Sequence, residues 1–273
     1  MWKSTNRDSN SAGWELNMIL TVDIGNTNIK IGAWDNDQLS FVSRIATNSI
    51  RTEDEYAISL LEILKLNDCN RLQFDGAILA SVVPPLSTTM ANAVSRIIQT
   101  NRVYQVGPGV KTGLNIKIDN PAQLGADMVC ASVSAAAKYS LPCIIASLGT
   151  ATAIFALNET GDFLGGAVAP GMIISLEALS SRTAQLPHIS FEVPQSLIGT
   201  NTEDCMKSGL IYGNAAMLDG MITRFKEQLG PNATAIACGG LARFVVPHCR
   251  ETIIYDDNMV MDGLRIIYHK NAK

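Results

Sequence analysis

The feature that most constrains the fold is a strand–turn–strand segment that occurs twice. In the first copy the apolar run Met18–Val22 leads into Asp23 and a Gly–Asn turn, and an alternating stretch follows at Ile29–Trp34. Such runs predict buried strands, and a tight turn between two strands predicts a hairpin. The second copy, Ile144–Phe155, has the same design around a Gly–Thr turn. Two such units in one chain of 273 residues indicate two copies of one fold that face each other across a cleft.

The first turn has the composition of a phosphate-binding loop. Gly25 allows a positive φ and a close approach of the backbone, so consecutive amides can point at a phosphate. Asp23, at the end of a buried strand, can hold a hydrated Mg²⁺ that bridges phosphates. Asn26, Thr27 and Asn28 add neutral donors. The alternative is a plain hairpin whose Asp and Asn side chains bond only to their own turn.

Paired loops of this kind resemble those of the acetate and sugar kinase, heat-shock ATPase and actin superfamily. The resemblance implies an α/β fold of two RNase H-like domains with mixed sheets, in the architecture of actin-like ATPases and kinases, with ATP between the domains. The predicted order of the first half, three strands, helix, strand and helix, is that of an RNase H-like domain. We therefore predict a flexible N-terminal extension at residues 1–17, an N-terminal domain at 18–120 and a C-terminal domain at 121–273.

The first predicted helix follows the capping sequence Thr52–Glu55. Its predicted buried face carries Ile58, Leu61, Leu64 and Leu66. The other elements predicted in this half are strands at 40–45 and 74–83 and a helix at 87–98.

Composition excludes several classes of protein. Apolar residues make up 47% of the chain and charged residues 17%, which is typical of a soluble globular protein. A net charge of −4 without any Lys/Arg run argues against nucleic-acid binding. The sequence also has no apolar run long enough for a membrane span, and residues 1–17 lack the apolar core of a secretory signal. Six scattered cysteines without a Cys-x-x-Cys pair suit a reducing compartment, so we expect a cytoplasmic protein.

A series of motifs extends the resemblance along nearly the whole chain from Met18. In order, they are Asp23–Lys30, Val106–Asp127, Ser147–Thr152, Gly165–Gly171, Ser175–Leu179, Arg182–Pro187, Asn201-Thr202, Ser208-Gly209, Gly239–Ala242 and Asp262–Ile267. Their order resembles that of the type III pantothenate kinases, which phosphorylate pantothenate at the entry to coenzyme A synthesis. A single Gly-rich motif would be weak, but the ordered set is specific.

The resemblance implies a role for each matching residue. The ATP phosphate loop would be formed by Asp23, Ile24, Gly25, Asn26, Thr27, Asn28, Ile29 and Lys30, with Thr150 as a further ATP contact. The pantothenate site would be formed by Gly125, Ala126, Asp127, Met128 and Thr202. Asp127 would be the base that takes the proton from the primary hydroxyl, since a carboxylate within hydrogen-bond reach can activate an alcohol.

The resemblance further implies the cofactors ATP and Mg²⁺, a monovalent cation (K⁺ or NH₄⁺) near Ser147, and a homodimer with the pantothenate pocket near the interface. From the residues alone, Asp127 could instead be only a helix-start residue, because an acid in the first turn favours the helix dipole. Gly239–Ala242, which follows a strand predicted at 233–238, could back the adenine or serve helix–strand packing. Glu177 is left unassigned.

Three positions depart from the family pattern. Met128 stands where the family usually has Arg, Ser147 where it has Asp, and Ile118 where it has Tyr. The first change removes a planar cationic fork that Met cannot replace. Two hypotheses follow: an active pantothenate kinase, or a catalytically weakened or inactive paralogue that acts as a nucleotide- or metabolite-binding regulatory protein.

Overall fold

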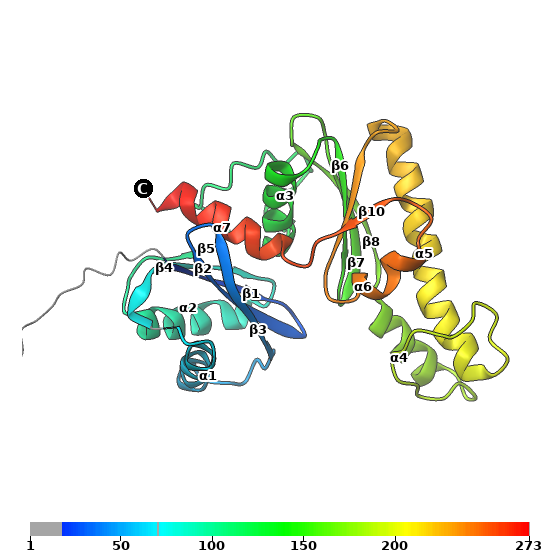
Figure 1. The fold of residues 1–273 in the computed structure, drawn as a ribbon, viewed down its shortest axis with the longest axis horizontal. Helices are drawn as coiled ribbons and strands as arrows, with labels where there is room; N and C mark the ends of the chain where they lie inside the picture. The colour runs from blue at the N-terminus through cyan, green and yellow to red at the C-terminus, as the bar shows by residue number, and fades with distance from the viewer. Residues whose placement is uncertain (1–17, 70, 273) are drawn as a thin grey trace, which may run out of the picture.

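The computed structural model describes residues 18–69 and 71–272, so the extension predicted at 1–17 lies outside the described residues. The N-terminal half is built on a five-stranded mixed sheet with the order β3-β2-β1-β4-β5 (Figure 1). Its strands are β1 (Met18–Ile24), β2 (Asn28–Asp35), β3 (Gln38–Ala46), β4 (Phe74–Ser81) and β5 (Val103–Gln105). β1 pairs antiparallel with β2 and parallel with β4. The first predicted hairpin is therefore confirmed.

The second sheet repeats the first strand for strand. It has the order β10-β9-β6-β7-β8, and β6 pairs antiparallel with β7 and parallel with β9. Its strands are β6 (Cys143–Leu148), β7 (Ala151–Leu157), β8 (Phe163–Pro170), β9 (Thr234–Cys238) and β10 (Ile253–Tyr255). The prediction of two similar α/β halves with mixed sheets, each opening with an antiparallel hairpin, is confirmed.

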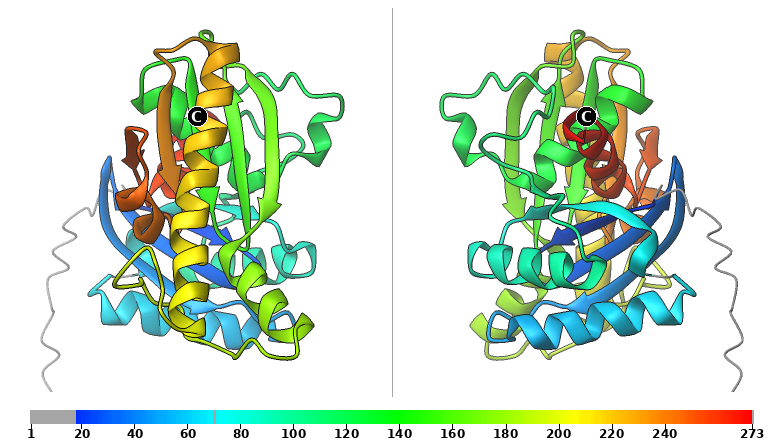
Figure 2. Two further views of the ribbon diagram at one scale, coloured as in Figure 1. Left: turned by 90° about the vertical axis from the view of Figure 1, so that its right-hand side faces the viewer. Right: turned by 90° about the vertical axis from the view of Figure 1, so that its left-hand side faces the viewer.

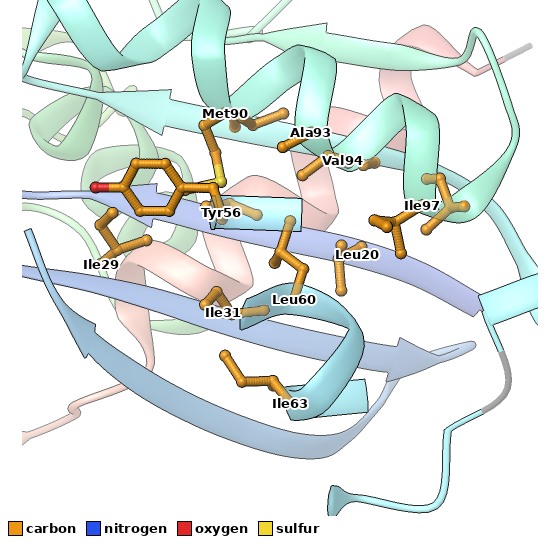
Figure 3. Close-up of a cluster of buried hydrophobic side chains, with 14 of the residues drawn as sticks. Leu20, Ile29, Ile31, Tyr56, Leu60, Ile63, Met90, Ala93, Val94 and Ile97 are labelled. Atoms are coloured by element: carbon orange, nitrogen blue, oxygen red, sulfur yellow. The ribbon is translucent and has the colours of Figure 1, made fainter. Parts of the chain in front are cut away.

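Two helices, α1 (Glu53–Leu66) and α2 (Pro84–Ile98), cover one face of the first sheet and form a core with it (Figure 3). Thr52 and Glu55 make the predicted capping box. The predicted buried face was partly wrong, because Ile58 and Leu66 are 62% and 81% exposed. The residues of α1 that are buried are Tyr56, Ala57, Leu60, Ile63 and Leu64, at the i, i+1, i+4, i+7 and i+8 positions of one helix face.

The outer face of the second sheet is covered by α4 (Met172–Arg182), α5 (Thr202–Leu229) and the short α6 (Ala242–Val245). Figure 2 shows α5 running along the length of this sheet. Short 3₁₀ turns lie at Arg71–Gln73, Pro121–Gln123 and Val246–His248. No helix among the described residues has the length and apolar character needed to cross a membrane.

Two further helices, α3 (Ala126–Lys138) and α7 (Met259–Asn271), lie between the sheets and pack against each other (Figure 1). One apolar cluster joins both helices to β1, β2 and β4, and another joins α3 to β6 and β7. Gly263 makes the close approach possible, because a Cβ there would overlap the backbone carbonyl of Cys130. The domain boundary at 120/121 stays a prediction. The last helix of the predicted C-terminal domain, α7, packs against β1 and β4 of the first sheet.

Gly263→Ala should therefore destabilise the protein by about 1–3 kcal/mol, the usual cost of overpacking a core. The matched control is Gly213→Ala on α5, where an added Cβ meets no atom within 4 Å. Alanine is the better helix former, so this control should be as stable as the parent or more stable. Urea unfolding of both variants tests the prediction, and equal midpoints for the two would contradict it.

Candidate active site

The two predicted phosphate loops lie against each other. Thr27, between β1 and β2, and Thr150, between β6 and β7, are 3.2 Å apart at their hydroxyl oxygens, although 123 residues separate them in the sequence. Both side chains belong to exposed residues. The structure therefore brings together one loop from each sheet, as the internal repeat led us to expect.

Each loop is a tight turn closed by its own glycine. The Gly25 amide donates to the Asn28 carbonyl at 3.1 Å, and the Gly149 amide donates to the Ala151 carbonyl at 3.0 Å. Asn26 and Asn28 are exposed beside Thr27. Ile24 and Ile29 are fully buried in the first core, so only their backbone atoms are available to a ligand.

Asp23, next to the first loop, and Asp127 lie close enough for their charges to interact. Asp23 is the last residue but one of β1, and burial together with the negative charge of Asp127 raises the pKa of Asp23 to about 7, against a lowering effect of Lys30. Neither Asp23 oxygen accepts a hydrogen bond from the rest of the described chain. Burial also raises the pKa of Asp127. A pair of half-buried carboxylates with raised pKa values is typical of a functional site.

Asp127 lies in the first turn of α3, as predicted. Its Oδ1 accepts a hydrogen bond from the Met128 amide at 2.8 Å, and this bond opposes the rise in its pKa. Gly125 precedes the helix, and a Cβ there would lie 2.6 Å from Oδ1. The local sequence thus fixes one oxygen of Asp127 at the helix start, while Oδ2 makes no hydrogen bond to the other described residues.

Lys30 is paired with Asp23 across the β1–β2 hairpin. Its ammonium donates to Oδ1 of Asp257 at 3.0 Å and to the Asp257 backbone carbonyl at 3.3 Å. The other oxygen of Asp257 bonds Arg44 on β3 at 2.5 Å. Sequence reasoning missed Asp257 and Arg44. The one local signal was a pair of acids, Asp256 and Asp257, between the last strand and the last helix.

The three positions that depart from the family pattern lie on the inner side of the second sheet. Ser147 is on β6, in register with Cys238 on the neighbouring strand β9, and burial raises the pKa of the Cys238 thiol to about 12. Met128 and Ile118 both pack against the apolar cluster that contains Phe155. Two of the three departures therefore extend a single apolar surface.

Thr202 lies apart from the other predicted substrate residues. It begins α5, after the helix cap Asn201, whose side chain accepts from the Asp204 amide. α5 and α3 cover opposite faces of the second sheet, and no hydrogen bond joins Thr202 to residues 125–128 among the described residues. Thr202 instead lines a cavity of about 590 Å³, together with Gln185, Pro187, Asn201 and Glu203.

Comparison with known proteins assigns the chain to a family. The family model for type III pantothenate kinase matches residues 19–224. The chain belongs to the type III pantothenate kinase family. The curated type III pantothenate kinase of Exiguobacterium sibiricum is 42% identical over 254 residues, which cover 93% of this chain and all of the relative. That of Halalkalibacterium halodurans is 39% identical, again over 93% of this chain and all of the relative.

Solved structures support the fold independently of sequence. A Campylobacter jejuni protein described as a Baf family transcriptional activator aligns with a TM-score of 0.57 at 16% identity, over 93% of this chain and 98% of that one. Component A of (R)-2-hydroxyglutaryl-CoA dehydratase from Acidaminococcus fermentans gives 0.57 at 14% identity, over 94% and 99%. At such low identity these likenesses establish the two-domain fold alone.

Asp23→Asn should stabilise the protein, and the gain should grow with pH. In the unfolded chain Asp23 ionises near its ordinary pKa of 3.8, whereas in the folded protein it stays protonated up to about pH 7. The parent therefore loses unfolding free energy between these pH values, and the neutral Asn does not. The gain should be small near pH 4 and reach its maximum above pH 7, in urea unfolding without nucleotide.

The control for this pH dependence is Asp162→Asn. Hydrogen bonds from Asn115 and Asn158 help to hold the pKa of Asp162 below its ordinary value. Its contribution to stability is therefore present above pH 4 and lost as the pH falls, so this variant should lose stability at neutral pH. A gain for Asp23→Asn that is equal at pH 4 and pH 8 would contradict the assignment of a raised pKa to Asp23.

Proposed function

We propose that the chain transfers the γ-phosphoryl group of ATP to the primary hydroxyl of pantothenate, giving 4'-phosphopantothenate in the first step of coenzyme A biosynthesis. The observation that carries this proposal is the meeting of Thr27 and Thr150 at 3.2 Å, together with two interacting carboxylates, Asp23 and Asp127, whose pKa values are raised. Membership of the type III pantothenate kinase family supports the choice of substrate. The six cysteines, all free, fit the reducing conditions of the cytoplasm.

The proposed nucleotide site consists of residues 23–30 and Thr150. Loop amides and the hydroxyls of Thr27 and Thr150 would donate to the phosphate oxygens, and Lys30 would add a positive charge. Asp23 fits a role in holding Mg²⁺ through water, since it is a hard oxygen ligand with no competing hydrogen bond from the described chain. The ion, when bound, neutralises phosphate charge. The negative charge of the half-buried Asp23 carboxylate, which is costly when ionised alone, would then be compensated.

The proposed base is Asp127. The pantothenate hydroxyl would donate its proton to Oδ2, because Oδ1 is already held by the Met128 amide at 2.8 Å. The hydroxyl oxygen then bonds to the γ-phosphorus as the bond from that phosphorus to the bridging oxygen breaks, and ADP leaves. A raised pKa makes Asp127 a stronger proton acceptor once it is ionised. The rest of the catalysis would be positioning and charge stabilisation by the two loops.

For the substrate we propose contacts with Gly125, Ala126, Met128 and Thr202. Thr202 and Asp127 lie on helices that cover opposite faces of the second sheet. We therefore also propose a homodimer, with the pantothenate pocket near its interface. The exposed apolar side chains of Val168, Leu197 and Ile198, which are 71%, 60% and 80% exposed, support a surface of this kind.

We propose Ser147 as the position of the monovalent cation, K⁺ or NH₄⁺. It offers a neutral hydroxyl where the family has a carboxylate. A single neutral ligand binds a cation more weakly than a charged one. The cation requirement of this chain should therefore be weaker, or its cation affinity lower, than a carboxylate would give.

The purified protein should release ADP only when pantothenate is present with Mg-ATP. A coupled ADP-release assay at high enzyme concentration, run in parallel with K⁺, NH₄⁺ and Na⁺ at saturation, measures both the activity and the cation preference. Folded protein that stays silent with every cation would refute the kinase proposal and would favour the inactive regulatory paralogue.

Asp127→Asn should lower kcat by about 10²–10⁴, the usual contribution of a general base. The amide keeps the size of the side chain and can still accept from the Met128 amide, so the start of α3 should persist. Calorimetry should give an ATP affinity close to that of the parent. The Asp162→Asn variant serves as the control, since that carboxylate is remote from the loops. An unchanged kcat for Asp127→Asn would mean that Asp127 is only a helix-start residue.

A further inference from the structure

The junction between β10 and α7 connects the two halves of the molecule through Asp257. Its carboxylate bonds Lys30 on β2 at 3.0 Å and Arg44 on β3 at 2.5 Å, across 227 and 213 residues of sequence. Its backbone carbonyl accepts a second hydrogen bond from Lys30 at 3.3 Å. One residue of the C-terminal half thus holds two cations of the first sheet.

The junction is itself anchored to the second sheet and to α3. The Asp256 amide donates to the Ala237 carbonyl at 2.9 Å, and the Asp256 carboxylate accepts from Lys138 and Tyr139, both at 2.7 Å. These two residues lie at the C-terminal end of α3, the helix that begins at Asp127. The position of Asp257 is therefore set by the same elements that set the position of Asp127.

Lys30 lies where its ammonium could pair either with Asp257 or with Asp23. Antiparallel register sets it opposite Asp23, and directly opposed residues have Cβ atoms about 4.5–5.5 Å apart. The Lys30 side chain is only 15% exposed, so its ammonium needs a protein partner or a ligand. Without Asp257, the nearest carboxylate across the hairpin is that of Asp23. An ion pair between Lys30 and Asp23 would engage both groups within the phosphate loop.

We propose that Asp257 is a positioning residue of the nucleotide site, which holds the Lys30 ammonium away from Asp23 and directed toward the phosphate loops. An ammonium has three N–H donors, and Asp257 takes two of them, so one remains for a phosphate oxygen. Arg44 bonds the other oxygen of Asp257, so the carboxylate stays paired with a cation when the third donor of Lys30 turns to a ligand. The inference rests on the proposed function only in placing ATP at residues 23–30.

The test is Asp257→Asn, which keeps the size of the side chain and removes its charge. Calorimetric titration with Mg-ATP should show an affinity roughly tenfold weaker, the effect expected when one charge-assisted hydrogen bond is lost. In the ADP-release assay the KM for ATP should rise in parallel, while the KM for pantothenate stays within about twofold. Asp257→Glu, which restores the charge, should recover part of the affinity.

The matched control is Asp37→Asn. Asp37, in the β2–β3 turn, forms an ion pair with Arg265 on α7, so it also links the first sheet to the C-terminal helix without touching Lys30. This variant should leave the affinity for Mg-ATP unchanged. If it weakened binding as much as Asp257→Asn, the effect would come from the general attachment of α7, and the proposal would be overturned.

Measurements in the Lys30→Met variant distinguish a role of Asp257 in positioning Lys30 from a general structural role of Asp257. If Asp257 acts through Lys30, adding Asp257→Asn to Lys30→Met should not weaken Mg-ATP binding further. An additional tenfold loss of Mg-ATP affinity in that background would overturn the proposal. A tighter Mg-ATP affinity of the single Asp257→Asn variant would also overturn it, because it would mean that Asp257 competes with phosphate. Arg44→Gln, which leaves the Lys30–Asp257 pair in place, should have a smaller effect than Asp257→Asn and gives a further readout if the latter folds poorly.

Calorimetry needs no turnover, so the two proposals can fail separately. A chain that binds Mg-ATP in an Asp257-dependent manner but never phosphorylates pantothenate would refute the proposed function and support the inference. If the chain phosphorylates pantothenate and the parent and Asp257→Asn bind ATP with equal affinity, the proposed function is supported and the inference about Asp257 is refuted.

Discussion

The packing of α3 against α7 is the constraint on which the rest of the structure depends. These two helices fill the space between the sheets, and their contact is close because Gly263 has no side chain opposite the Cys130 carbonyl. The N-terminal end of α3 carries Asp127, and the segment that leads into α7 carries Asp257. A change in the separation of the helices would move both residues relative to the loops that carry Thr27 and Thr150. The geometry of the candidate site thus depends on this apolar contact as well as on the polar bonds that anchor Asp256.

The charges of the candidate site raise the free energy of the folded state, and the packing of α3 against α7 must offset this increase. Asp23 and Asp127 are both half-buried, and each of them raises the free energy of the folded state when ionised. Their proximity adds to the cost, since the charge of Asp127 is one of the causes of the raised pKa of Asp23. A purely structural hairpin would gain stability from a neutral residue at position 23. The retention of an acid there is understandable if a cation and a polyphosphate compensate its charge when bound.

The sequence was sufficient to predict those parts of the fold that depend on local patterns. Both hairpins, the capping box at Thr52 and the helix that starts beside Asp127 follow from residues within a few positions of each other. The meeting of Thr27 and Thr150 could be anticipated because the repeat implied two equivalent loops. The prediction of the buried face of α1 was partly wrong, since the amphipathic pattern of this helix is compatible with more than one buried stripe. Tertiary packing on the sheet selected the stripe that contains Tyr56 and Leu60.

The partners of Lys30 could not be predicted in this way. Nothing near Lys30 in the sequence points to an acid 227 residues away, and the pairing exists only because α7 returns to the first sheet. The same holds for Lys138 and Asp256, which α3 and the β10–α7 junction bring together. Charged contacts between distant segments depend on the relative placement of whole elements, and local sequence does not encode that placement.

The departures from the family pattern bear on the chemistry through the environment of Asp127. Met128 follows Asp127 on α3 and packs, as Ile118 does, against the cluster that contains Phe155. A guanidinium at position 128 would lower the pKa of an adjacent carboxyl group, whereas a thioether leaves the effect of burial opposed only by backbone hydrogen bonds. The proposed base is therefore more basic in this chain, and its pocket more apolar, than an arginine at position 128 would allow.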